Sequence, residues 1–128
     1  MTDRIVAGNI KLKRVYEAPA ATDGIRVLVD RLWPRGLKKA DVASDRWMKD
    51  LAPSGELRRW FGHDPARWEE FRRRYSAELR AHAALLQELR DLARSGQVTL
   101  LFGARDETHN EAVALRDQLL GRPGREAS

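Results

Sequence analysis

The 128-residue chain contains no cysteine. This absence excludes disulfide bonds, thiolate nucleophiles and zinc–thiolate sites together. No apolar run approaches the roughly 18 residues typical of a membrane-spanning helix, and the first residues lack the basic region and long apolar segment of a secretory signal. We therefore expect a cytoplasmic protein with no membrane partner.

The chain also lacks the short motifs that identify common enzyme classes. It has no phosphate-binding glycine loop, no nucleophile elbow and no paired zinc motif. The sequence therefore identifies no cofactor, and it leaves open whether the protein catalyses a reaction.

Positive charge is in excess. Lys and Arg together number 24 against 19 Asp and Glu, which gives a formal net charge of +5, and most of these cations are arginine. The planar arginine fork suits carboxylate and phosphate oxygens. A general preference for arginine explains most surface positions equally well, so charge alone does not identify a partner.

The hydrophobic pattern predicts a small sheet with helices packed on it. Residues 25–29 and 97–102 are short apolar runs typical of buried parallel strands, and residues 10–16 alternate like an edge strand with its lysines outward. Residues 45–51 fit either a short strand or a helical turn. Helices are expected from Ser54 to Phe61, from Asp64 through Leu79, around Leu85 to Ala93, and from Thr108 to Leu120.

A strand followed by several helices and another strand suits a parallel crossover. We therefore predict an α/β, Rossmann-like fold with a three- or four-stranded, mostly parallel sheet. One domain should span residues 10–120, with flexible ends at 1–9 and 121–128.

Polar residues follow the first apolar run directly. Asp30 is a candidate general base, Arg31 and Arg35 could hold an anion, and Trp33 could form an apolar wall for a flat ligand. The alternative is a structural Asp30–Arg31 pair that orders the loop. A loop rich in arginine and tryptophan is unusual for scaffolding alone, so both interpretations stay open.

A second polar segment follows the run at 97–102. It contains Arg105, Asp106, His109 and Asn110, and histidine is the side chain most often used for acid–base chemistry near neutral pH. Thr108 to Glu111 also matches a capping box, in which the two side chains satisfy the first amides of a helix. His109 is therefore either a catalytic group or an exposed residue at a helix start.

Both segments should meet in one cleft, because ligands of open α/β sheets bind outside the carboxyl ends of the strands. The catalytic candidates are His109, Asp30 and Asp106, and the ligand-binding candidates are Arg31, Trp33, Arg35, Arg105 and Asn110. The three catalytic candidates could also group around a metal, but they lack a recognised ligand spacing, and we predict no metal site.

Several blocks of the chain resemble those of domain-of-unknown-function family 488, in its YeaO-like branch, over roughly positions 10 to 120. The blocks are residues 28–37, 50–54, 57–61, 63–68 and 100–110. The resemblance implies a compact α/β domain and no established activity. The broader family often carries a Cys-His-Arg element after its last strand, where this chain has Thr108-His109-Asn110, so a thiol-dependent mechanism is excluded.

Our leading hypothesis is an enzyme or sensor that binds a small phosphate- or carboxylate-bearing molecule in the cleft. The alternative is a nucleic-acid-binding or protein-interaction module that uses an arginine-rich surface. That surface would comprise Arg58, Arg59, Arg67 and Arg72 to Arg74. Glu69 and Glu70 are spaced to pair much of it, which weakens the alternative. The sequence does not predict an oligomeric state.

Overall fold

The computed structural model describes residues 5–121, and its centre is a four-stranded parallel sheet with the order β1-β4-β2-β3. The strands are β1 (Ile10–Arg14), β2 (Ile25–Leu28), β3 (Arg46–Trp47) and β4 (Val98–Phe102). The predicted α/β fold with a parallel sheet is therefore confirmed, and β1 is an edge strand as expected.

The α-helices in the described part are α1 (Lys39–Val42), α2 (Gly55–Phe61), α3 (Trp68–Arg80), α4 (Ala83–Ser95) and α5 (Glu111–Leu119). The ambiguous segment at 45–51 divides into β3 and a 3-10 turn, Lys49–Leu51. Ser54 caps α2 as predicted, because its hydroxyl accepts a hydrogen bond from the Leu57 amide at 3.1 Å. Asp64 instead caps a 3-10 turn, Pro65–Arg67, and α3 begins only after it.

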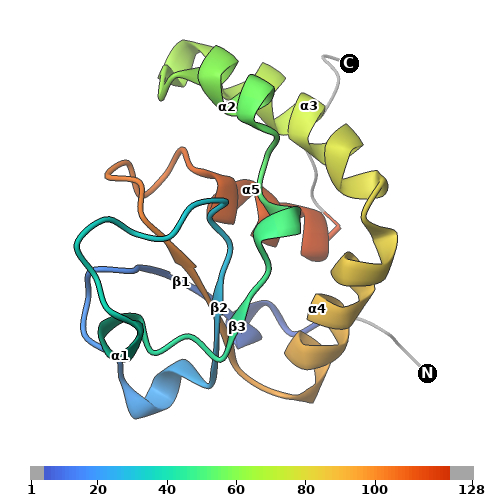
Figure 1. Cartoon of the computed structure of the whole chain (residues 1–128). Coiled ribbons are helices and arrows are strands. Elements are labelled where there is room, and N and C mark those ends of the chain that lie inside the picture. Colours follow the sequence, from blue (N-terminus) through green and yellow to red (C-terminus); the bar gives the residue numbers. More distant parts are fainter. Residues whose placement is uncertain (1–4, 122–128) are drawn as a thin grey trace.

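The two faces of the sheet are covered unequally (Figure 1). The larger core lies between one face and helices α2 to α5, and it includes Val27, Leu100, Phe71 and Leu115. The other face carries a small cluster of Val15, Leu28, Val42 and Leu101, packed against Trp33 and Leu37. All five residues of β4 are buried, which agrees with its continuous apolar sequence.

A buried ion network orders the amino end of β2. The Arg26 guanidinium pairs with Asp23 and donates to the Val42 carbonyl at 2.7 Å, while Lys13 Nζ reaches Asp23 at 2.9 Å. Burial opposes ionisation of Asp23, but the hydrogen bonds from Lys13, the Ala20 amide and Arg26 outweigh it and lower its pKa.

The first described residues contact helix α4. Residues Ala7–Asn9 form a 3-10 turn, and the Asn9 side chain donates to the Ala93 carbonyl at 2.9 Å. Residues 1–4 and 122–128, where flexible ends were also expected, lie outside the described residues, and the domain boundaries stay a prediction. Within residues 5–121, every helix is too short or too polar to cross a membrane.

Candidate functional site

A pocket of about 470 Å³ opens at the carboxyl ends of β2 and β4. These strands are neighbours, and hydrogen bonds also join the residues that follow them. The Val29 amide donates to the Leu101 carbonyl at 3.1 Å, and the Gly103 amide donates to the side-chain oxygen Oδ2 of Asp30 at 2.9 Å. The structure therefore joins the beginnings of the two polar segments at one site, as the parallel arrangement predicted. The volume lies within the range of small-molecule pockets.

Five of the eight predicted site residues line this pocket and three do not. Those that line it are Asp30, Arg31, Trp33, Arg35 and Asn110. Arg105, Asp106 and His109 lie outside the lining. The pocket also takes residues that the sequence analysis did not assign to it, among them Tyr16, Arg58, Arg59, Phe61, His63, Phe71 and Glu111.

Arg31 and Trp33 are held by backbone carbonyls. The Arg31 guanidinium donates to the carbonyls of Pro53 and Ala52 at 3.2 and 3.4 Å, and the Trp33 indole donates to the Leu37 carbonyl at 2.7 Å. Asp30 receives its hydrogen bond from Gly103 rather than from Arg31. Arg31 therefore orders the loop without the Asp30 pairing that the sequence suggested as an alternative.

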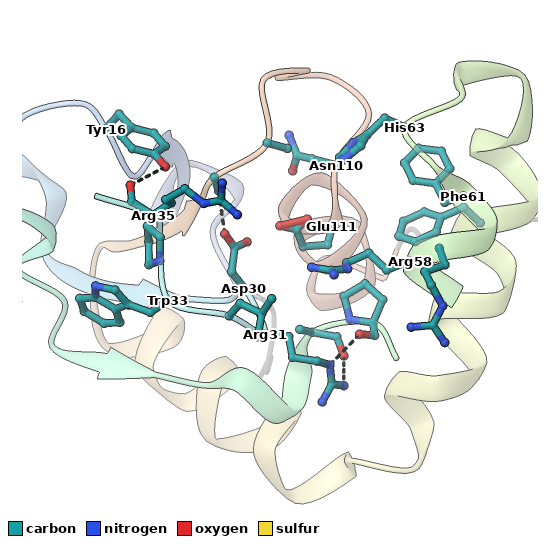
Figure 2. A pocket seen from close by; sticks show the side chains of 18 residues that line it. Tyr16, Asp30, Arg31, Trp33, Arg35, Arg58, Phe61, His63, Asn110 and Glu111 are labelled. Atoms are coloured by element: carbon teal, nitrogen blue, oxygen red, sulfur yellow. Dashed lines mark hydrogen bonds between the residues drawn. The ribbon is translucent and has the colours of Figure 1, made fainter. Parts of the chain in front are cut away.

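The pocket contains a pair of carboxyl groups, Asp30 and Glu111 (Figure 2). Glu111 is the first residue of α5, and its carboxyl group lines the pocket together with that of Asp30. Burial raises the pKa of Glu111 well above its usual range, and the neighbouring Asp30 carboxyl raises it further, while the Arg58 guanidinium opposes the shift. The site therefore favours the neutral, protonated form of Glu111 more strongly than water does.

Three arginines of the lining have side chains without a direct partner. Arg35 follows β2, and Arg58 and Arg59 belong to α2. Within the described part of the chain, none of these guanidinium groups makes a hydrogen bond or an ion pair. In Figure 2 the Arg58 side chain extends beside Glu111. These three groups retain their full capacity to donate to an anion.

Asp106 and His109 form a turn beside the pocket instead. Asp106 Oδ1 accepts from the amides of Thr108 and His109, both at 2.9 Å, and Asp106 Oδ2 lies 3.0 Å from His109 Nδ1. The two amide hydrogen bonds lower the pKa of Asp106 far below its usual value. The His109 ring packs edge-on against Trp68 at 5.2 Å. Asp106 thus stays ionised and orders the turn.

The predicted capping box from Thr108 to Glu111 is wrong. Asn110 begins α5, because its side-chain oxygen accepts from the Val113 amide at 3.0 Å. Its side-chain nitrogen donates to the Asp106 carbonyl at 2.8 Å. Thr108 contacts Asp106 instead, which leaves Glu111 in the pocket.

Within residues 5–121, the structure brings together no set of three His, Asp or Glu side chains that could hold a metal ion. Three guanidinium groups of the lining can bind an anion, and the oxygens of two carboxyl groups can accept hydrogen bonds from a ligand.

Comparison with known protein families shows to which family this chain belongs. Residues 9–127 match the family model described as "Inactive DUF488-N3 subclade". The chain belongs to this family. The DUF488 resemblance seen in the sequence is therefore confirmed.

The relatives of this DUF488 chain include three proteins whose names also give no activity. It is 46% identical to the "Uncharacterized protein YeaO" of Escherichia coli over 111 residues, which are 87% of this chain and 96% of the relative. It is 45% identical to Mb3100c of Mycobacterium bovis and to Rv3073c of Mycobacterium tuberculosis, over 88% of this chain and 95% of each relative. No solved structure matches the chain significantly.

Proposed function

We propose that this protein binds a small molecule carrying a phosphate or carboxylate group in the pocket at the ends of β2 and β4. The observation that supports this most directly is the set of three arginines, Arg35, Arg58 and Arg59, whose guanidinium groups line the pocket without a hydrogen-bond partner in residues 5–121. Guanidinium groups bind phosphate and carboxylate oxygens in a bidentate manner, with stronger hydrogen bonds than neutral donors make.

The remainder of the lining fits a small organic ligand. Trp33, Phe61 and Phe71 supply apolar surface, and Phe61 and Phe71 stack on each other with ring centres 4.4 Å apart. Fixed aromatic walls with a few convergent polar groups are typical of small-molecule sites.

We favour binding over catalysis. The subclade is described as inactive, and the acid–base candidates His109 and Asp106 are engaged with each other outside the pocket lining. A sensor or carrier of an anionic metabolite needs only the pocket. We also keep the cytoplasmic location as part of this proposal.

The arginine-rich surface offers less support for nucleic-acid binding. Arg72 pairs with Glu69 at 3.1 Å and Asp117 at 3.0 Å, and Glu70 pairs with both Arg73 and Arg74. Acids beside a basic run reduce its attraction for the phosphate backbone.

Thermal-shift measurements test the proposal with inorganic phosphate, pentyl phosphate and succinate as probes. A probe at about 100 times its dissociation constant should add roughly 2.7 kcal/mol to the free energy of unfolding. Arg35→Ala and Arg58→Ala should reduce this gain. Arg80→Ala is the matched control, because Arg80 is exposed at the end of α3, away from the pocket lining.

The proposal fails if no probe stabilises the protein, or if Arg35→Ala and Arg58→Ala bind as the Arg80→Ala control does. Arg105→Ala provides a separate comparison. A loss of binding in this variant alone would move the site from the pocket to the 105–110 loop.

A further inference from the structure

The pocket has two chemically different regions. Arginines without partners supply donors, while the Asp30–Glu111 pair supplies acceptors. The carboxyl oxygens of this pair would repel an anion placed directly against them. A ligand that uses both regions must therefore carry an anionic group for the arginines and a separate hydrogen-bond donor for the carboxyl pair.

The hydrogen bonds within the site leave acceptors free on the carboxyl pair. Two carboxyl groups offer about eight lone-pair positions, as a general count of acceptor capacity. Asp30 Oδ2 accepts from the Gly103 amide at 2.9 Å. Most of the acceptor capacity is open to a ligand that donates.

The charge around the pair favours a neutral donor over a cationic one. Burial and the neighbouring Asp30 carboxyl favour the neutral form of Glu111, and the nearby Arg58 guanidinium already interacts with this carboxyl group electrostatically. A ligand ammonium group placed here would meet the repulsion of three guanidinium groups, whereas a hydroxyl group would not. The donor is thus best supplied by hydroxyl groups.

The walls suit a ring or carbon chain between the two ends of such a ligand. Trp33, Pro34, Pro53 and Phe61 all contribute to the lining, and Trp33 is fixed by its hydrogen bond to the Leu37 carbonyl. We propose that the pocket recognises a phosphorylated sugar or polyol, with the arginines on the phosphate and the Asp30–Glu111 pair accepting from ligand hydroxyls. This inference rests on the proposed function and names its ligand class.

Three five-carbon probes test it on the intact protein by isothermal titration calorimetry. Ribose 5-phosphate carries both the phosphate and the hydroxyls, pentyl phosphate lacks the hydroxyls, and 5-aminopentyl phosphate replaces them with one ammonium group. We expect ribose 5-phosphate to bind about 10- to 100-fold more tightly than pentyl phosphate, as hydrogen bonds to a charged group predict. Asp30→Asn should bring this ratio close to one, while Glu107→Gln, an exposed substitution on the neighbouring loop, should leave it unchanged.

The outcomes separate the two proposals. Equal affinity for ribose 5-phosphate and pentyl phosphate would overturn the ligand class and leave anion binding intact. Tighter binding of 5-aminopentyl phosphate than of ribose 5-phosphate would also overturn the ligand class, because the preferred donor would then be a cation. Failure of all three probes, of inorganic phosphate and of succinate would overturn both proposals. Since the ratio is measured first on the unaltered protein, the test does not depend on the stability of Asp30→Asn.

Discussion

Replacing Glu111 by glutamine should change how the stability of the protein depends on pH. Glutamine has nearly the same shape and is uncharged, like the protonated carboxyl group, but it cannot ionise. Burial and the Asp30 carboxyl raise the pKa of Glu111 well above the 4.5 of a free glutamate. Between 4.5 and this raised value, the folded protein holds a proton that the unfolded chain has released.

The sign of the effect follows from that difference in bound protons. Where the folded state binds more protons than the unfolded state, the free energy of unfolding falls as pH rises. The slope for one group is about 1.4 kcal/mol per pH unit, reached once the unfolded group is fully ionised. The free energy of unfolding of Glu111→Gln, relative to that of the natural protein, should therefore increase by this amount for each unit of pH. For a domain of this size, this corresponds to a relative shift of roughly 5 °C in Tm per pH unit.

Urea unfolding monitored by tryptophan fluorescence at several pH values above 4.5 measures the difference directly. Asp23 and Asp106 have lowered pKa values and titrate below this window, and both groups are shared by the two proteins. Glu107→Gln is the control, because Glu107 is exposed. If Glu111→Gln and the natural protein gave parallel stability curves above pH 4.5, the pKa of Glu111 would not be raised in the folded protein and this reasoning would be refuted.

Three further substitutions test other parts of the structure. Asn110→Ala removes the cap of α5 and should lower the free energy of unfolding by about 1 kcal/mol, measured by urea unfolding. Gly24→Ala should prevent stable folding, seen as lost cooperative unfolding, because Gly24 has a φ of 63° and a Cβ would lie 2.2 Å from the Gln97 carbonyl oxygen. Asp23→Asn should destabilise the protein at pH 7 by about 3–5 kcal/mol, since it leaves Arg26 buried beside a neutral group. Because the pKa of Asp23 is lowered, this loss should shrink as the pH falls below 3.8. An unchanged stability at pH 7 would contradict the buried ion network.

The sheet could be predicted because its signals are local. The apolar runs at 25–29 and 97–102 correspond to β2 and β4, and the helical segment between them required a crossover. Parallel pairing then placed Asp30 beside the residues that follow β4. The prediction thus identified the end of the sheet at which the pocket lies, without any information on helix packing.

The pocket itself could be predicted only in part, because its other wall comes from distant packing. Arg58 and Arg59 lie on α2, and no local pattern indicates that this helix packs over the ends of β2 and β4. Glu111 was missed for a different reason. Thr108 and Asn110 are both good capping residues, and the sequence could not decide which of them begins the helix.

The choice of Asn110 as the cap has consequences for charge. It makes Glu111 the first residue of α5, where the helix dipole favours a carboxylate. Burial and the neighbouring Asp30 carboxyl outweigh the dipole and raise the pKa of Glu111. If both groups were ionised, their two negative charges would oppose an incoming anion and offset two of the three free guanidinium groups. The raised pKa of Glu111 favours its neutral form, which reduces this repulsion, so the position of the helix cap and the proposed anion specificity depend on each other.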